Sequence, residues 1–463
     1  MAEPIDIGSP RWWVDQLERE LANRQAHMRL MDDYYTGNHP LPFVTKAHDA
    51  KMRDEFRGLL EDARSNFMRL VIDAVEERLR VEGFRRTVEG EEVTDREALA
   101  IWQANQMDAE SQVAFIEALV KGVSYLSVWV GDDGEPTIAV EDPEQTIVAY
   151  EPGTNYRRRL AALKLWVDEW TGERRANLYL PDGIYKFRRK DAEPVGVVLP
   201  WNVRPEGGWE FVEGEAFVPN PIGEVPIVPL RNRPRLLVEG ESEISDVTDI
   251  QDRINAMLFL RCLAGYFGAH RQRWAVGLTL HENERTGEPE EPFDIAVDKL
   301  IVAEDTNVRF GEWSATPLDG YIKATEQDAQ HIAVVTRTPR HYLLPEGQEP
   351  SGDSQRAAEA GLTKKVARKQ RTYGEGIAEA IRLARLFGGE SDAPAPEIRW
   401  ADPEIRTEAE ITDATIKQYQ AGLIPREAAL EKLGYSQTQI SRFLEALGNE
   451  PAGESEQPEA AAE

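Results

Sequence analysis

The sequence predicts an α+β fold in which a β-rich region is followed by two helices that flank a short acidic insert, and then by a third, longer helix. Three observations predict it. Apolar residues recur at helical spacing through most of the first 120 or so residues. From Tyr125 the period changes to two, which is typical of strands. Beyond about residue 240, helical spacing returns in three long stretches.

Composition limits the class of protein. The chain has 463 residues, 41% apolar and 30% charged, as expected of a soluble globular protein with roughly two to four domains. The chain has no apolar run of about 18 residues, so no membrane span is expected. The N-terminus lacks the pattern of a signal peptide. The single cysteine, Cys262, excludes an intramolecular disulfide and fits a reducing cytosol, where we expect it to pack rather than react. A net charge of −29 disfavours tight DNA binding but allows a protein that touches DNA without holding it.

The first 240 residues or so are expected to form one α+β domain. A helix should begin at Ser9-Pro10 and end near Gly37, because serine and proline favour helix starts and glycine favours helix ends. Further helices are expected at about 63–81, 95–106 and 111–122, the last two joined at Met107-Asp108. Strands follow, including a hairpin whose turn is the three residues Pro181-Asp182-Gly183. Shorter strands are expected near residues 196–199, 209–212 and 227–230.

A long helix is expected from about residue 240, capped by Ser242 or Ser245, to about Gln272. It carries a narrow apolar stripe, and such a stripe favours packing against copies of the same helix. The residues of this stripe that we assign to packing are Ile244, Val247, Ile254, Met257 and Leu258. Residues 273–316 hold ten acidic and four basic side chains. They form a small insert, with short strands expected at 300–302 and 308–310. A second helix then runs from Leu318 and ends before Pro339.

A glycine- and proline-rich loop at 344–354 precedes a third helix, from Ser354 to about Phe387. The first half of this helix is basic, with one acidic residue, Glu359, and Gly374 and Gly376 further along would permit a kink. Two interpretations remain open for the basic residues. They form a solvated or intersubunit salt-bridge surface, or they face the phosphates of DNA. The residues are Arg356, Lys364, Lys365, Arg368, Lys369 and Arg371.

An extended segment at 397–400 and short helices at 408–421, 425–433 and 437–447 follow, and the helical pair around Gly422 resembles a helix-turn-helix by pattern alone. The last sixteen residues hold five glutamates and no basic residue, which is typical of a disordered tail. The chain has no phosphate-binding GxxxxGK[ST] loop, no GxGxxG, no HExxH and no GxSxG. Its seven histidines are scattered without metal-ligand spacing. We therefore expect no cofactor, no metal and no catalytic residue.

The order of these elements resembles the portal proteins of tailed phages of the siphophage type, over about residues 10–450. Four segments carry the resemblance. They are Tyr34-Tyr35-Thr36-Gly37-Asn38, Arg69-Leu70-Val71-Ile72-Asp73-Ala74-Val75, the run from Asn220 to Pro229 (NPIGEVPIVP), and Gly240-Glu241-Ser242-Glu243-Ile244. Each segment alone is only modestly specific for this family, and the order of the segments along the chain is more specific.

The resemblance implies the following parts. They are a wing at 1–239, a stem formed by 240–272 and 318–338, a clip at 273–317, a tunnel loop, kinked helix and linker within 339–401, a short crown at 402–447 and a tail at 448–463. It implies that the tunnel-loop residues Glu346, Gly347, Gln348, Ser351 and Gly352 face DNA.

By the same resemblance, the protein would form a ring, typically of twelve subunits, at a capsid vertex of the virion, after assembly in the host cytoplasm. It would contact double-stranded DNA non-specifically, the terminase large subunit, the head–tail connector, and the major capsid and scaffolding proteins, with no membrane partner.

Two alternatives remain from the sequence. One is another virion structural protein, such as a head–tail adaptor or minor capsid component, although its length argues against an adaptor. The other is an uncharacterised hydrolase with an acidic site in the β-rich region.

Overall fold

The computed structural model describes residues 6–41, 58–59, 61–88, 91–131, 134–154, 156–189, 208–269, 273–276, 309–312, 314, 316–344, 352–404, 408–435 and 437–448. The described chain divides into two compact units, residues 1–401 and 402–463. The second unit holds three short helices close to their expected positions, α11 (Glu408–Gln420), α12 (Arg426–Lys432) and α13 (Gln437–Gly448). The finer division into wing, stem, clip and crown stays a prediction.

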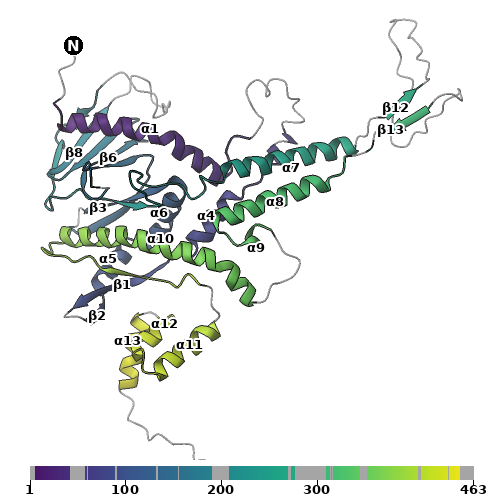
Figure 1. Cartoon of the computed structure of the whole chain (residues 1–463). Coiled ribbons are helices and arrows are strands. Elements are labelled where there is room, and N and C mark those ends of the chain that lie inside the picture. The colour runs from purple at the N-terminus through teal and green to yellow at the C-terminus, as the bar shows by residue number, and fades with distance from the viewer. Residues whose placement is uncertain are drawn as a thin grey trace, which may run out of the picture. The chain divides into compact units, whose positions relative to one another are not determined.

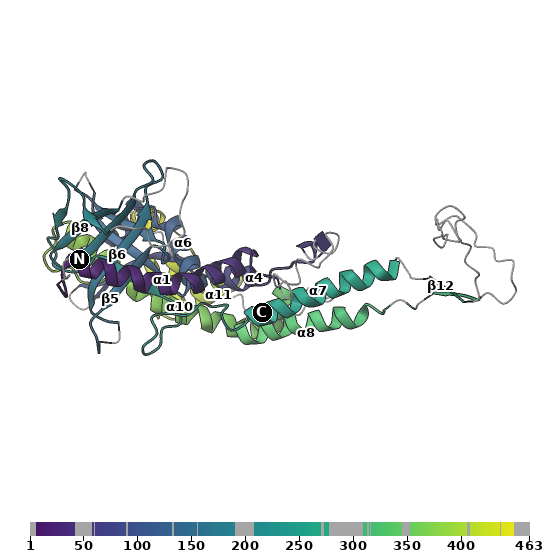
Figure 2. The same cartoon turned by 90° about the horizontal axis from the view of Figure 1, so that it is seen from above.

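Helix α1 (Pro10–Thr36) begins and ends where the sequence predicts. The Oγ of Ser9 accepts a hydrogen bond from the backbone N–H of Trp12 at 3.3 Å, and Pro10 occupies the first turn. Gly37 ends the helix at φ 85°, a left-handed conformation that glycine adopts without strain. The apolar face of α1 packs against the largest sheet, as Figures 1 and 2 show.

All sheets among the described residues are antiparallel. The largest has the strand order β10-β8-β7-β6-β5, with β9 paired to β8. Two three-stranded sheets follow the orders β11-β3-β4 and β14-β1-β2, and β12 pairs with β13. The strands are β1 (Val81–Val88), β2 (Glu91–Thr94), β3 (Val123–Val130), β4 (Pro136–Glu141), β5 (Thr146–Tyr150), β6 (Arg159–Val167), β7 (Arg174–Leu180), β8 (Gly183–Arg189), β9 (Glu210–Phe211), β10 (Phe217–Pro219), β11 (Ile227–Arg231), β12 (Arg273–Val276), β13 (Arg309–Glu312) and β14 (Glu397–Trp400).

Three local predictions were wrong. The hairpin between β7 and β8 has a two-residue turn, because Leu180 pairs with Gly183. The link between α5 (Arg96–Ala104) and α6 (Met107–Lys121) is Asn105-Gln106. The helix expected at 63–81 is shortened to α4 (Met68–Glu76). At its N-terminal end the reason is tertiary, because the side chains of Gln251 and Asn255 bind the backbone N–H groups of Phe67 and Ser65 at 2.9 and 3.0 Å. At its C-terminal end the chain turns at residues 77–78 and β1 begins at Val81.

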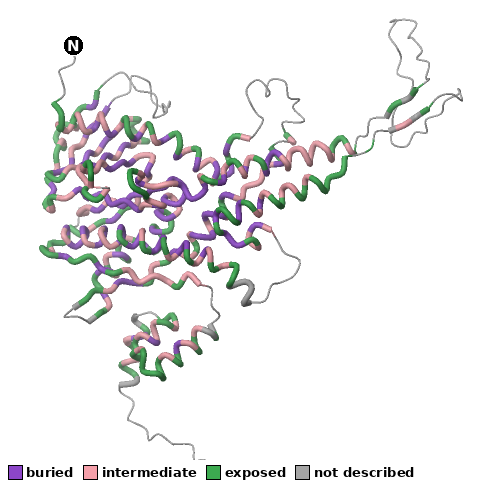
Figure 3. Tube along the Cα trace, in the orientation of Figure 1, coloured by how far each residue is buried: buried purple, intermediate pink, exposed green. Residues whose placement is uncertain are grey.

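Helices α7 (Thr248–Ala269) and α8 (Asp319–Thr336) lie side by side and run away from the three larger sheets in both Figures 1 and 2. Helix α8 confirms the expected position of the second helix. Helix α7 begins eight residues later than expected, because residues 243–247 form a bend and a turn packed in the core. Arg253 of α7 pairs with Asp328 of α8 at 2.8 Å. Figure 3 shows burial at the inner ends of the pair and exposure further out.

Helix α10 (Gly352–Phe387) packs along β3, β4, β11 and β14 and confirms the long helix of the sequence. Two of its glycines allow close packing. A Cβ on Gly376 would lie 2.6 Å from a methyl carbon of Leu230, and one on Gly374 would lie 3.3 Å from the indole nitrogen of Trp400. Because β14 pairs with β1, residues near both ends of the first unit share one core with α10. Short helix α9 (Arg340–Leu343) precedes α10 in the chain.

Candidate functional site

The candidate site begins with a tight approach between two glycines. Gly122 ends α6 with φ 90°, and its carbonyl accepts the backbone N–H of Asn232 at 2.8 Å. A Cβ on Gly240 would lie 2.0 Å from the carbonyl oxygen of Gly122, so only glycine fits there. The backbone N–H of Glu243 then donates to the carbonyl of Leu119 at 2.8 Å. The segment 240–244 is therefore fixed against the end of α6.

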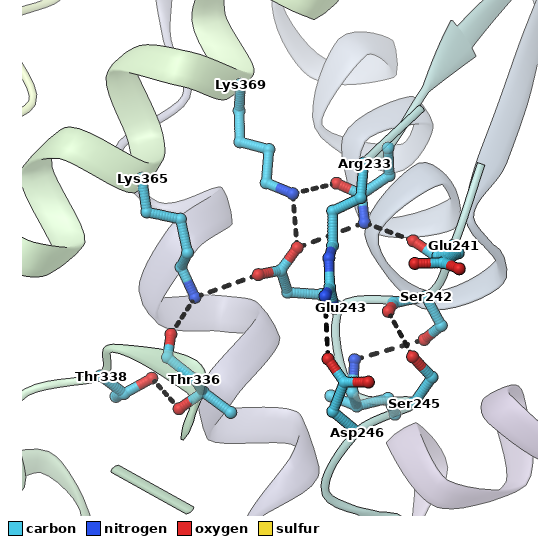
Figure 4. A network of polar contacts seen from close by, with 12 residues as sticks. Arg233, Glu241, Ser242, Glu243, Ser245, Asp246, Thr336, Thr338, Lys365 and Lys369 are labelled. Carbon is cyan, nitrogen blue, oxygen red and sulfur yellow. Dashed lines mark hydrogen bonds and ion pairs between the residues drawn. The ribbon is translucent and has the colours of Figure 1, made fainter. Parts of the chain in front are cut away.

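This placement directs the carboxylate of Glu243 at two lysines of α10, as Figure 4 shows. The Nζ of Lys365 lies 3.3 Å from Oε1, and the Nζ of Lys369 forms an ion pair with Oε2. The Nδ2 of Asn232 donates to Oε2 at 3.2 Å. Lys365 and Lys369 stand one helical turn apart, so they lie on the same face of α10.

The same lysines reach two further elements. The Nζ of Lys365 donates to the backbone carbonyl of Thr336, the last residue of α8, at 2.6 Å. A cation at the C-terminus of a helix also interacts favourably with the helix dipole. The Nζ of Lys369 donates to the side-chain oxygen of Asn232, which also accepts the hydroxyl of Tyr373 at 3.1 Å. We call this cluster, formed by Asn232, Glu243, Thr336, Lys365, Lys369 and Tyr373, the polar junction.

Burial and charge together set the protonation of the junction. Burial alone would raise the pKa of Glu243, but the two lysine ammonium groups hold this pKa at about 2. Burial lowers the pKa of Lys369 to about 8, although the carboxylate of Glu243 acts in the opposite direction, and burial also lowers the pKa of Lys365. Two ammonium groups share one carboxylate, which limits how far that carboxylate offsets the cost of burying them.

The junction is a structural tie rather than a reaction centre. Each of its side chains belongs to a residue less than a tenth exposed, so a substrate does not reach them. It joins the turn before α7, the end of α8, the loop after β11 and the middle of α10. Among the described residues, no group of three or more His, Cys, Asp or Glu side chains is arranged to hold a metal ion.

The structure places the predicted packing residues of the long helix in two settings. Ile244, Val247 and Ile254 are fully buried in the core of their own subunit. They are therefore not exposed to a neighbouring subunit, and Ile244 and Val247 precede α7. Met257 and Leu258 are half-buried, and their role between subunits stays a prediction.

The predicted basic surface of α10 is also divided. Lys365 and Lys369 are 8% and 4% exposed and pair within the subunit, so we no longer count them among side chains that face DNA or a neighbour. Lys364, Arg368 and Arg371 are exposed. Arg356 lies within α10, and its side chain is outside the described residues. The loop residues Glu346, Gly347, Gln348 and Ser351 are outside them as well, while Gly352 begins α10.

Sequence reasoning missed the role of Asn232 and the inward direction of the two lysines. A signal was present for the lysines, because Leu362, Val366 and Tyr373 recur at the same helical spacing and are all fully buried. A lysine on an apolar face requires a buried partner.

Comparison with known proteins identifies the class. Residues 15–448 match the model of a family described as phage portal protein, SPP1 Gp6-like. The chain therefore belongs to this family of phage portal proteins, which are structural virion components rather than enzymes.

Two individual relatives agree. The portal protein of Mycobacterium phage L5 is 32% identical over 457 residues, covering 91% of this chain and 87% of the relative. The portal protein of Mycobacterium phage D29 is 30% identical over 458 residues, covering 93% of this chain and 87% of the relative.

Within the described residues, no helix combines the length and hydrophobicity that a membrane span requires.

Proposed function

We propose that this portal protein assembles into a ring of twelve subunits at one capsid vertex and conducts double-stranded DNA into and out of the capsid. The observation that carries the proposal is the α7–α8 pair. Large apolar side chains along the pair are left uncovered within the subunit. Tyr266 at 40% and Phe267 at 47% exposed stand near the outer end of α7, and Val334 at 77% and Val335 at 50% exposed stand near the inner end of α8. Neighbouring copies in a closed ring would cover such side chains, and each subunit would contribute the same pair.

The charge of the chain supports passage of DNA rather than tight binding. A net charge of −29 repels a polyanion at long range. Lys364, Arg368 and Arg371 are exposed on α10, and in a ring each would become a circle of positive charge. We propose that the segment between α9 and α10 faces DNA and that these three side chains contact phosphates or a neighbouring subunit.

We further propose partners for the remaining parts. Residues 273–317 would dock first the terminase large subunit, which supplies the energy for packaging, and later the head–tail connector. The wing would contact the major capsid and scaffolding proteins. The protein would assemble in the host cytoplasm and remain at the capsid vertex in the virion.

Deletion of residues 347–352 tests the DNA-facing role. We expect deletion to leave the mass of the assembled ring unchanged and to impair DNA packaging or retention, measured as the protected genome per particle. If the deletion variant packages and retains the same amount of DNA as the parent protein, the segment does not act on DNA. If the ring no longer forms, the segment is structural.

A further inference from the structure

A second cluster lies at the base of the segment that joins α9 to α10. Arg78 follows α4, in a turn anchored by the buried residue Leu79, and its side chain is 9% exposed. One terminal nitrogen, Nη1, donates to the backbone carbonyl of Ala74 at 2.9 Å. This bond ties the guanidinium group to α4, whose apolar face is part of the main core. Arg78 is therefore held on a rigid support.

The other terminal nitrogen of Arg78 reaches both sides of the segment. Nη2 donates to the hydroxyl of Tyr342, in α9, at 2.7 Å and lies 3.6 Å from Oε2 of Glu359, in α10. The hydroxyl of Tyr342 in turn donates to Oε1 of Glu359 at 3.4 Å. His341 adds a contact of 3.7 Å between Nε2 and the same Oε1. Tyr342 and Glu359 are 17 positions apart in the sequence, yet one arginine holds both.

The geometry suits a positioning role. Glu359 is 14% exposed at its side chain, so solvent screens its ion pair with Arg78 only partly. The planar guanidinium group presents several donors in a fixed arrangement, which lysine cannot reproduce. Further along α10, Leu362 is buried in the main core and Lys365 belongs to the polar junction, which includes no residue of α9. Arg78 thus ties both ends of the segment to α4, and it adds to the direct contacts of His341 and Tyr342 with Glu359.

We propose that Arg78 fixes the spacing between the end of α9 and the start of α10, and so positions the intervening segment for its passage of DNA. The role in DNA passage rests on the function proposed above, whereas the role in setting the spacing does not. Replacement of Arg78 by methionine keeps most of the buried volume and removes every donor. The two ends would then be held by the weaker contacts that His341 and Tyr342 make with Glu359 and by the burial of Leu343 and Leu362 in the main core.

Distance measurement between two spin labels tests the spacing directly. Labels are placed on Arg340→Cys and Ala358→Cys, both at exposed positions, with Cys262 replaced by serine. Labelled subunits are diluted with unlabelled ones before assembly. We expect a narrow distance distribution in the parent, and a broader one in Arg78→Met. Arg78→Lys should restore the narrow distribution in part, because lysine keeps the charge but cannot donate hydrogen bonds to both sides as arginine does.

Arg80→Met is the matched control. Arg80 stands two residues further on, its side chain is 72% exposed, and it pairs with Glu82 on the surface at 3.5 Å. The Arg80→Met variant should leave the distance distribution unchanged. Where Arg78→Met does not fold, Tyr342→Phe removes a single hydroxyl from the cluster and should also broaden the distribution. A distribution as narrow as that of the parent in a folded Arg78→Met ring, or in Tyr342→Phe where that variant replaces it, would overturn the proposal.

DNA packaging by the same variants tests the consequence for function. We expect loss of packaged DNA in Arg78→Met and none in Arg80→Met. If the 347–352 deletion abolishes packaging while Arg78→Met broadens the distribution and packages fully, the positioning role is wrong. If the deletion itself has no effect, the DNA-facing role fails, and the spacing is still decided by the labels.

Discussion

Replacement of Glu243 by glutamine should destabilise the first unit by a calculable amount. The change keeps the size of the side chain and removes the charge that Lys365 and Lys369 share. A pKa held at about 2, against an ordinary 4.5, corresponds to about 3 kcal/mol, since each pKa unit represents ~1.4 kcal/mol. Removal of one partner from a buried ion pair typically costs about 3–5 kcal/mol. The two routes give the same order of magnitude.

Calorimetry of the unassembled subunit measures this effect. A unit of residues 1–401 has an unfolding entropy on the order of 0.8 kcal/mol per kelvin, so a loss of ~3 kcal/mol lowers the melting temperature by about 4 °C. Glu241→Gln is the matched control, because Glu241 pairs on the surface with Arg235. Its effect should stay below ~1 kcal/mol. Adding Lys369→Met to Glu243→Gln should recover part of the loss.

The pH dependence has a defined sign. The ordinary pKa of Glu243 is 4.5 and its pKa in the folded protein is about 2. Its contribution is therefore complete above about pH 4.5 and is lost as the pH falls toward 2. The difference between the parent and Glu243→Gln should shrink over that window. Equal melting temperatures for the parent and Glu243→Gln near pH 7 would refute the assignment of the junction as a stabilising ion pair.

Three further outcomes are expected. Gly240→Ala should lower the unfolding free energy by ~1–3 kcal/mol or more, because its Cβ would overlap the carbonyl of Gly122; urea titration measures this, and an unchanged midpoint would contradict it. Arg385→Met should cost about 3–5 kcal/mol in the same assay, since it removes the ion-pair partner, at 2.5 Å, of the fully buried carboxylate of Asp95. Lys369 loses its proton at about pH 8 in the folded protein and at 10.5 when unfolded, so stability should rise across that window in the parent, and Lys369→Met should remove part of the rise.

The sequence predicted the elements whose own spacing and caps determine them. Helix α1 needed only Ser9, Pro10 and Gly37 together with its apolar face, and α8 and α10 followed from apolar periodicity. Elements altered by distant side chains were not predictable in this way. The shortening of α4 at its N-terminal end depends on Gln251 and Asn255, which stand more than 180 positions further along the chain.

The candidate site was predictable only in fragments. The motif Gly240–Ile244 was recognised as characteristic, and Lys365 and Lys369 were recognised as basic. Their meeting depends on Glu243, 126 positions before Lys369, and on Gly240 fitting against Gly122. Such contacts arise from the tertiary fold, which periodicity does not encode. Arg78 gave no sequence signal, because a single arginine after a helix is usually exposed.

We propose that identical copies of this chain close into a ring around a channel. Native mass measurement of the purified protein, together with images of the same particles, tests it most directly. We expect a closed ring of twelve subunits with a central opening, held together through the α7–α8 pairs. Substitution of Val334 and Val335 by serine should weaken that ring. A protein that remains monomeric under every salt condition would contradict the claim.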